Sequence, residues 1–352
     1  MRFAYARLLA AVVFVLTSLV AVTMSNADEL DALKGKTIRG IIGEAAGETT
    51  DVQSRLFFKY LQMALPDTTI LLQNKPGGGG GKALKELFDA SGDVLTIATL
   101  SRNPIYARLM KPDDAPYDVS KVIWVGSLAK VNRLLAVRSS LGGATMDYLQ
   151  NLDRQPKIGA TSSLGAAAIE PLMMNAMTKL RFKVISGMAE ADRQVMLLAG
   201  DLDGRMGTLR ELQPLFDSGD MVPVLKFTKE GYPKSLDGIP TIADVVEGDG
   251  SKDIVWVLET LDKIGGLMVA AAPNSNPEML QGLRLAFDQV ASDPNFRGEA
   301  AKIYFDIDPN NGGELTEALS RIIGPTSDMG EKMRAAFDCG TKKSDAGATT
   351  CN

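Results

Sequence analysis

Histidine is absent from this 352-residue chain, and aromatic residues make up only 6% of it. Without histidine, the chain lacks the commonest general base and metal ligand. A serine hydrolase triad of the usual kind is excluded, because its base is a histidine. The scarcity of aromatic residues disfavours a sugar site built on stacked rings. We therefore expect a binding protein rather than an enzyme, with no cofactor and no metal.

Cysteine is also rare, and the two that occur, Cys339 and Cys351, lie near the C-terminal end. In an oxidising compartment we expect them to form a disulfide that closes a short loop in the tail, residues 339–352. A metal site is disfavoured, because structural zinc sites ordinarily use four cysteine or histidine ligands. We interpret the pair as structural.

An apolar run at residues 8–22 follows two arginines at the N-terminus. The run is shorter than the ~20 residues of a membrane-spanning helix, and small residues follow it up to Ala27. This pattern predicts a secretory signal peptide, residues 1–27, that is cleaved after Ala27. The alternative is a retained membrane anchor.

The acidic residues outnumber the basic ones, and the formal net charge is −5. Removal of the two arginines of the signal peptide makes the mature chain more acidic, at −7. An acidic surface argues against nucleic acid or an anionic membrane as partner. The roughly 325 residues that remain are too many for one ordinary core and favour two lobes.

Strand and helix patterns alternate along the mature chain. A strand at 38–42 precedes a helix in which Val52, Leu56, Tyr60 and Ala64 form one apolar stripe. The alternation recurs at strand-like segments 70–72, 94–100, 157–160, 183–186, 202–206 and 222–227. Repeated units of this length predict an α/β fold, with a mainly parallel sheet flanked by helices in each lobe.

The order of these units suggests how the two lobes share the chain. We place the first lobe at residues 28–135 and 266–338, and the second lobe at residues 136–265. Residues 134–137 are expected to cross between the lobes, and residues 267–271 to return. We expect the C-terminal helices to pack on the first lobe.

Five consecutive glycines, Gly77 to Gly81, stand between a predicted strand and a predicted helix. Glycines let backbone N–H groups approach a ligand closely, and a helix N-terminus favours an anion. A flexible surface loop is the alternative. A nucleotide loop is disfavoured, because Pro76 and Ala83 stand where its motif requires Gly and Ser or Thr.

Three loops follow separate predicted strands and are rich in Gly, Ser or Thr: residues 43–51, 74–82 and 161–165. In open α/β sheets, ligands bind outside the carboxyl ends of the strands. We therefore expect these loops to line one cleft that binds a small anion. The candidate ligand-binding residues are Gly47, Glu48, Thr49, Thr50, Asp51, Asn74, Gly77, Gly78, Gly79, Ser101, Thr161, Ser162, Ser163 and Gly165.

Other roles remain open for several of these side chains. Asp51 is equally suited to stabilise the N-terminal turn of its helix through the helix dipole. The hydroxyl residues Thr49, Thr50 and Thr161–Ser163 are equally suited to cap helices. Acid–base chemistry by Glu44, Glu48 and Asp51 is disfavoured, because one short loop rarely fixes the separation that paired carboxylates need.

Four arginines are candidate partners for a ligand carboxylate, and no spacing singles one out. They are Arg102, Arg133, Arg205 and Arg210.

Four segments carry a resemblance to a known family: residues 47–51, 74–79, 117–121 and 240–244. They are similar to that family's G-G-T-x-D, N-x-P-G-A-G-G, Y-D-P-x-K-D and P-T-x-A-E motifs, in the same order along nearly the whole mature chain. The chain therefore resembles the periplasmic solute-binding receptors of tripartite tricarboxylate transporters, the Bug-type receptors.

The resemblance implies a two-lobed periplasmic-binding-protein fold of type II, a Venus flytrap, that closes on a small di- or tricarboxylate. It also implies a periplasmic location and inner-membrane permease subunits as partners. We expect a monomer. Gly187 joins the candidate ligand-binding residues, because segment 186–188 replaces the family's aromatic or Tyr-Lys-Gly segment.

One departure bears on the ligand. Glu48 stands where the family has its second glycine, and it adds a negative charge beside the expected carboxylate site. One alternative is therefore a receptor for an uncharged or cationic metabolite, with Glu48 and Asp51 as counter-charges. A third reading is a secreted enzyme or a sensor-associated binding protein.

Overall fold

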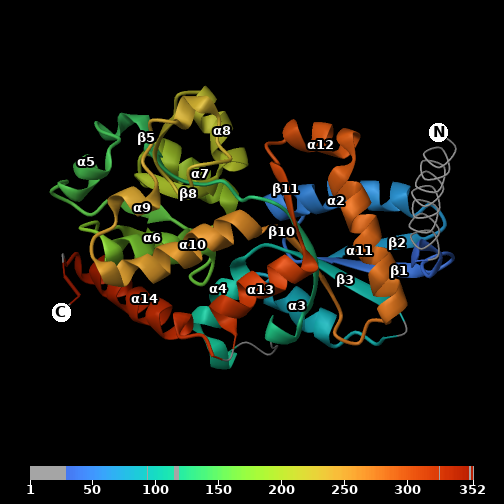
Figure 1. Ribbon diagram of the computed structural model, residues 1–352. Coiled ribbons are helices and arrows are strands. Elements are labelled where there is room, and N and C mark those ends of the chain that lie inside the picture. The colour runs from blue at the N-terminus through green and yellow to red at the C-terminus, as the bar shows by residue number, and fades with distance from the viewer. Residues whose placement is uncertain (1–28, 93, 115–118, 325, 349, 352) are drawn as a thin grey trace, which may run out of the picture.

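Two separate β-sheets divide the chain into two lobes (Figure 1). The computed structural model describes residues 29–351, except 93, 115–118, 325 and 349. The predicted signal peptide and the first two residues of segment 117–121 lie outside this part of the chain. Among the described residues, no helix has the length and apolar character needed to cross a membrane.

The first lobe contains a six-stranded sheet in the order β11-β4-β10-β3-β1-β2. Its strands are β1 (Thr37–Ile42), β2 (Thr69–Asn74), β3 (Leu95–Leu100), β4 (Ile123–Ala129), β10 (Gly266–Ala271) and β11 (Ile307–Asn311). Strands β2, β1 and β3 are parallel, whereas β10 runs antiparallel to both β3 and β4. Every residue of β3 and β10 is buried, so these two strands form the centre of the lobe.

Helices cover both faces of the first sheet because its side chains alternate between two apolar layers. Ile38 and Ile42 pack in one layer and Ile41 in the other. The first face carries α2 (Thr49–Ala64), α11 (Pro277–Ser292) and α12 (Pro294–Ala301). The second face carries α3 (Gly81–Phe88), α4 (Asn103–Met110) and α13 (Gly312–Ile323).

The second lobe contains a five-stranded sheet in the order β7-β6-β8-β5-β9. Its strands are β5 (Arg133–Arg138), β6 (Lys157–Gly159), β7 (Lys183–Ile185), β8 (Gly204–Thr208) and β9 (Met221–Lys226). The helices between residues 139 and 265 are α5 (Met146–Gln150), α6 (Ala166–Met177), α7 (Glu190–Ala199), α8 (Leu209–Asp217), α9 (Ile242–Val245) and α10 (Lys252–Ile264). The predicted two-lobed α/β fold is confirmed, and antiparallel strands make both sheets mixed.

The chain passes between the two sheets at two adjacent points. It leaves β4 and enters β5 through residues 130–132, and it returns from α10 into β10 at Gly265. The Val131 N–H donates to the Asp262 carbonyl oxygen at 2.8 Å, so the two crossings lie side by side. The crossings were expected at residues 134–137 and 267–271, but these residues lie within β5 and β10. The difference arises because local strand patterns do not reveal which sheet a strand joins.

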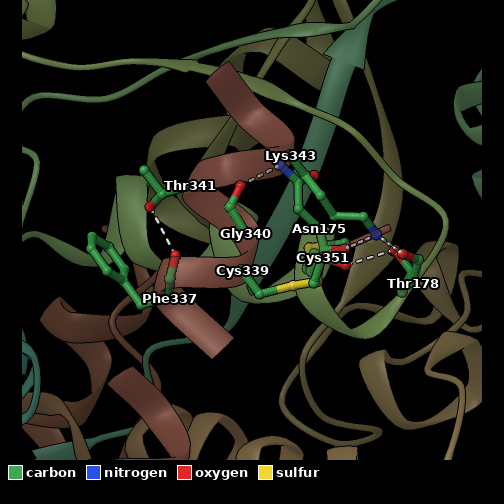
Figure 2. The surroundings of a disulfide bond; sticks show 9 residues. Asn175, Thr178, Phe337, Cys339, Gly340, Thr341, Lys343 and Cys351 are labelled. Carbon is green, nitrogen blue, oxygen red and sulfur yellow. Dashed lines mark hydrogen bonds between the residues drawn. A yellow bond between two sulfur atoms is a disulfide. The ribbon is translucent and has the colours of Figure 1, made fainter. Parts of the chain in front are cut away.

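The last helix, α14 (Met329–Ala346), packs on α6 of the second lobe. It also contacts α4 and α13 of the first lobe, so α14 lies against both lobes, whereas the expectation placed the C-terminal helices on the first lobe. The buried Lys343 explains this position, because its ammonium donates to the carbonyls of Asn175 (2.6 Å) and Thr178 (2.9 Å) at the end of α6 (Figure 2). A cation at a helix C-terminus satisfies carbonyls that lack partners within the helix.

A disulfide joins Cys339 within α14 to Cys351, with the Cα atoms 5.0 Å apart (Figure 2). Residues 339–346 of the predicted tail thus belong to this helix. One turn of the helix contacts α6 at Gly340, where an added Cβ would lie 1.9 Å from the Leu172 carbonyl oxygen.

We predict that Gly340→Ala destabilises the protein by about 1–3 kcal/mol, because the added methyl group forces α14 away from α6. The matched control is Gly298→Ala in α12, where an added Cβ meets nothing within 4 Å. That change should stabilise the helix by about 0.5–1 kcal/mol, since alanine is the better helix former. Chemical denaturation measures both, and a Gly340→Ala protein as stable as the wild type would contradict this packing.

Candidate functional site

A cavity of about 290 Å³ lies between the two lobes. The loop after β1, the start of α2 and the loop after β3 form its first-lobe wall. The start of α7, strand β8 and the start of α8 form its second-lobe wall. This volume is at the lower end of the range for small-molecule sites, roughly 300–1,000 Å³.

Six of the candidate residues line this cavity, and they follow three separate strands, β1, β3 and β6. They are Gly47, Glu48, Thr49, Thr50, Ser101 and Thr161. Residues from two of the three predicted loops, 43–51 and 161–165, therefore line one cavity.

The other nine candidates are not among the lining residues: Asp51, Asn74, Gly77, Gly78, Gly79, Ser162, Ser163, Gly165 and Gly187. Ser162 and Gly165 shape the start of α6, where the Gly165 N–H donates to the Ser162 carbonyl oxygen at 3.4 Å. Gly187 has a positive φ of 91° in the turn that precedes α7.

The glycine run forms a tight turn into α3 instead of facing the cavity. Gly77 to Gly80 all have positive φ, a conformation that other residues rarely adopt. Two backbone hydrogen bonds close the turn. The Gly81 N–H donates to the Gly78 carbonyl oxygen (3.1 Å), and the Lys82 N–H donates to the Gly77 carbonyl oxygen (3.3 Å). The first amides of α3 are therefore engaged within the turn.

Asp51 and Asn74 support the cavity loop from behind. The Asp51 carboxylate accepts from the Gly47 N–H (2.8 Å) and from Asn74 Nδ2 (2.8 Å), and Asn74 Nδ2 also donates to the Glu44 carbonyl oxygen (3.0 Å). Burial alone would raise the pKa of Asp51, but Arg55, Asn74 and the Gly47 amide outweigh it and lower that pKa. Asp51 therefore acts as a positioning residue for the loop.

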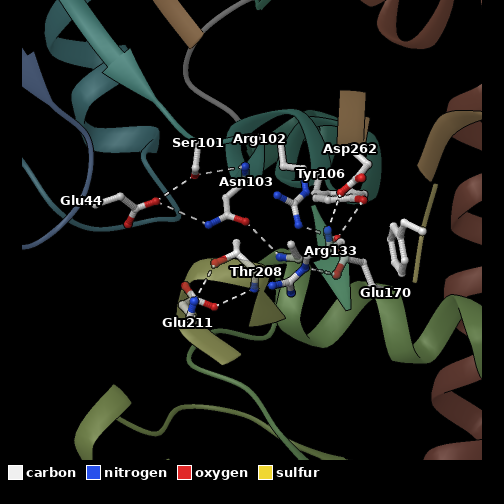
Figure 3. A network of polar contacts seen from close by, with 12 residues as sticks. Glu44, Ser101, Arg102, Asn103, Tyr106, Arg133, Glu170, Thr208, Glu211 and Asp262 are labelled. Carbon is white, nitrogen blue, oxygen red and sulfur yellow. Dashed lines mark hydrogen bonds and ion pairs between the residues drawn. The ribbon is translucent and has the colours of Figure 1, made fainter. Parts of the chain in front are cut away.

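The floor of the cavity rests on a fully buried carboxylate, Glu170 of α6 (Figure 3). Its Oε1 accepts from Arg102 Nη2 at 2.8 Å, and its Oε2 accepts from Arg133 Nε at 2.7 Å. Tyr106 donates to the same carboxylate at 3.3 Å. Because Arg102 and Tyr106 belong to the first lobe and Arg133 opens β5 of the second, Glu170 connects both lobes beneath the cavity.

A second buried carboxylate, Asp262, lies beside this network. It accepts from the Arg133 N–H (3.0 Å) and from the Thr228 hydroxyl (3.3 Å). Burial raises the pKa of Asp262 to about 6, although Arg102 and Arg133 act in the opposite direction. The crossing at residues 130–133 is thereby fastened to the end of α10.

Polar contacts join the two walls of the cavity. The Thr49 hydroxyl donates to Glu211 Oε1 (3.0 Å) and accepts from Arg210 Nη1 (3.1 Å) across the cleft. Asn103 Oδ1 accepts from the Ala166 N–H (3.0 Å) at the start of α6. The lobes are therefore in direct contact at the site, as expected for a closed clamshell.

Two arginines lie deep in the second-lobe wall. Arg193 is 3% exposed and Arg205 is 1% exposed, and the carboxylate of Glu190 pairs with both. Within the described part of the chain, the Nε of each arginine has no hydrogen-bond acceptor. Burial lowers the pKa of Arg193, and the adjacent charge of Arg205 lowers it further.

Glu211 balances part of this charge and caps its own helix. It forms a capping box with Thr208 at the start of α8. Burial would raise the pKa of Glu211, but Arg205, Arg133 and Arg193 lower it to about 2. Glu211 is therefore ionised at neutral pH.

Glu44, in the first-lobe wall, has a raised pKa, in contrast to the lowered pKa of Glu211. It accepts from the Ser101 hydroxyl at 2.8 Å and from Asn103 Nδ2 at 3.5 Å (Figure 3). Burial raises the pKa of Glu44 to about 7, and the neighbouring Glu48 adds to the increase. No described group of three or more acidic or cysteine side chains is arranged to bind a metal ion.

The arginines considered from the sequence, Arg102, Arg133, Arg205 and Arg210, all line the cavity. Sequence reasoning missed Arg193, Glu190 and Glu211 as site residues. The i,i+3 spacing of Glu190 and Arg193 indicates a helical ion pair, but nothing local places that pair in a cleft.

We predict that Glu170→Gln costs about 3–5 kcal/mol of stability, because it leaves two buried guanidinium groups without their counter-charge. The control is Glu299→Gln, where a carboxylate pairs with Lys59 at the surface and contributes little. Thermal and chemical unfolding compare the two. An unchanged Glu170→Gln protein would contradict the role given to this carboxylate.

Comparisons with known proteins agree with this fold. The family model of the tripartite tricarboxylate transporter family receptor matches residues 58–326. A search of curated proteins finds no significant match.

Several solved structures share the fold at low sequence identity. A Rhodopseudomonas palustris protein with adipate has 17% identity and a TM-score of 0.68, over 85% of this chain and 97% of that one. The periplasmic binding protein BugD has 15% identity and a TM-score of 0.66, over 86% and 97%. MatC from Rhodopseudomonas palustris, with bound malate, has 16% identity and a TM-score of 0.63, over 86% and 99%.

The proteins of the matched family are periplasmic solute receptors and not enzymes, in line with the prediction from the sequence. This chain belongs to the receptor family of the tripartite tricarboxylate transporters.

Proposed function

We propose that this receptor captures a small organic anion with at least one carboxylate, of the di- or tricarboxylate kind, in the cavity between its lobes. The observation that carries the proposal is the cationic second-lobe wall. Arg193, Arg205 and Arg210 line it, whereas Glu190 and Glu211 are its acids. Arg210 forms no ion pair with any described residue and contacts the Thr49 hydroxyl. One positive charge is therefore left for a ligand.

The starts of two helices support the same proposal. Thr49 and Thr50 at the start of α2, and Ala167 at the start of α6, line the cavity. The first amides of a helix have no partner within it, and the helix dipole adds a partial positive charge. An anion in the cavity would be stabilised by both helix ends.

The proposed mechanism is closure of the lobes around the ligand. Thr49 reaches Glu211 and Arg210 only when the two walls approach, and Asn103 reaches the Ala166 amide in the same way. A ligand that touches both walls binds the closed state better than the open one and shifts the equilibrium towards it.

The reading with Glu48 and Asp51 as counter-charges for a cationic or uncharged ligand is less well supported. Glu48 lines the cavity, but Asp51 does not, and its carboxylate is already paired with Arg55 at 2.9 Å. A wall with three arginines also disfavours a ligand that is only cationic.

We also propose that residues 1–27 are a signal peptide cleaved after Ala27, which delivers the mature chain to the periplasm. There it would act as a monomer and present its ligand to permease subunits of the inner membrane. The family assignment and the relatives solved with malate and adipate support this setting.

We predict that one or more of succinate, malate, adipate and citrate stabilises the natively exported protein, by about 2.7 kcal/mol at 100 times its dissociation constant. Arg210→Gln should weaken that binding by about 10- to 100-fold, because a charge-assisted hydrogen bond is lost. Arg297→Gln is the control, since Arg297 donates to the carbonyls of Ala291 and Ile307 and does not line the cavity.

Thermal shift and isothermal titration calorimetry measure both effects. If no carboxylate of the panel binds the wild type, or if Arg210→Gln binds as tightly as Arg297→Gln, the proposal is overturned.

A further inference from the structure

We infer that the two crossings between the lobes form a strained hinge, in which Asn132 and Leu267 are the pivot residues and the backbone strain at Leu267 opposes closure. This inference rests on the proposed function, because it describes how the lobes close on a ligand. It adds two positioning residues to the site.

The two crossings contain few residues that can take up a rotation of one lobe against the other. The first consists of residues 130–132 and the second of Gly265 alone. The second crossing also packs closely on the first, since a Cβ added to Gly266 would lie 2.4 Å from the Ala129 carbonyl oxygen. Hinges of this kind concentrate the torsional change in a few residues at the ends of elements.

The backbone torsions single out one residue at each crossing. Among the described residues other than glycine, three have a positive φ: Asn132 (56°), Leu267 (63°) and Tyr304 (52°). Asn132 ends the first crossing, and Leu267 is the second residue of β10, directly after the second crossing. Asparagine adopts the left-handed region with little strain, whereas a leucine there is unfavourable because its Cβ crowds the following carbonyl oxygen. The strain is therefore concentrated at Leu267.

The surroundings of Leu267 hold it in this conformation. Its side chain is 2% exposed and packs in the apolar layer of the first lobe that contains Phe305. The next residue, Met268, is paired with Leu100 of β3 and Ser127 of β4. Strained residues persist where packing fixes them, and they cluster at ligand clamps and switches. Because the residues after Leu267 are fixed in the first lobe, its φ sets the direction from which the chain arrives from α10.

Both pivots are connected directly to the cavity. Val131 and Leu267 are among the lining residues, so the crossings form part of the cavity wall. The Asn132 carbonyl oxygen accepts from the Leu209 N–H at 2.9 Å, at the start of α8, the helix that carries Arg210. A torsional change at Asn132 therefore moves the second-lobe wall relative to the first.

The strain belongs to the closed arrangement. Leu267 has its positive φ in a structure in which Thr49 and Asn103 of the first lobe contact the second lobe across the cleft. Rotation about the hinge on opening moves Leu267 towards negative φ, where leucine is unstrained. The free receptor then favours the open state, and ligand affinity is reduced by the fraction of receptor that is not ready to close.

The test compares glycine with alanine at each pivot, because both variants lose the native side chain and they differ in their tolerance of a positive φ. Leu267→Gly should bind malate or adipate about 5- to 30-fold more tightly than Leu267→Ala, the range expected from left-handed strain in one residue. Asn132→Gly should exceed Asn132→Ala in the same direction. Isothermal titration calorimetry on the full exported protein, after removal of co-purified ligand, measures these affinities.

Tyr304 provides the matched control. It has the same left-handed φ and is 44% exposed, but it lies between α12 and β11 of the first lobe and does not line the cavity. Tyr304→Gly should resist denaturant better than Tyr304→Ala, and the two variants should bind malate or adipate equally. A positive φ that does not change on closure affects stability alone.

A measurement without ligand keeps this inference separate from the proposed function. Spin labels on Met63→Cys in α2 and Leu198→Cys in α7, two exposed positions on different lobes, report the lobe separation by double electron–electron resonance. The free wild type should be mainly open, and Leu267→Gly should have a larger closed population than Leu267→Ala. A free wild type that is mainly closed would contradict the opposition to closure.

The outcomes distinguish the two proposals. If the glycine and alanine variants at Leu267 have equal affinities and equal label distances, the inference is overturned, and the proposed function stands as long as the carboxylates bind. If no carboxylate binds but Leu267→Gly is more closed than Leu267→Ala, the hinge is supported and the carboxylate function is overturned. If neither variant at the buried Leu267 folds, the pair at Asn132 decides, and equal affinities and label distances in that pair overturn the inference.

Discussion

The site depends on one buried carboxylate, that of Glu170, which pairs with Arg102 from the first lobe and Arg133 from the second. Neither guanidinium could be buried without this counter-charge, because an unpaired charge in the interior is strongly unfavourable. The pairings bring the start of α4 and the start of β5 to α6. The two walls of the cavity are thereby set at a separation that suits a small ligand.

The charges above this floor are divided between the lobes. The second lobe contributes arginines that its own acids only partly neutralise, and the first lobe contributes Arg102 together with Glu44 and Glu48. One ligand can contact both walls only when the lobes are close. Ligand recognition and lobe closure are then the same event, because differential affinity for the closed state drives both. Thr49 already contacts Arg210 across the cleft, so the two walls lie close together in this structure.

Local sequence signals were sufficient for the two-lobed α/β fold and for part of the site. Helix periodicity after β1 and the loops that follow β1, β3 and β6 led to Gly47–Thr50, Ser101 and Thr161, all of which line the cavity. The glycine run was misleading in one respect, since Gly77–Gly80 use their flexibility to turn the chain and their neighbours' amides are engaged within the turn. The position of α14 on the second lobe depends on Lys343 reaching the end of α6, a contact between residues that are far apart in sequence.

The pairings of Glu170, Arg193 and Glu211 could not be read from the sequence, because each is an ordinary charged residue in a helix until the tertiary fold gives it a partner. The central claim is that the cavity between the lobes, and no other surface, holds a small carboxylate against the arginine wall. A crystal structure of the natively exported protein with its co-purified ligand, identified by mass spectrometry, tests this most directly. We predict ligand oxygen atoms within hydrogen-bond distance of Arg210 or Arg205, and a ligand bound elsewhere above an empty cavity would contradict the account.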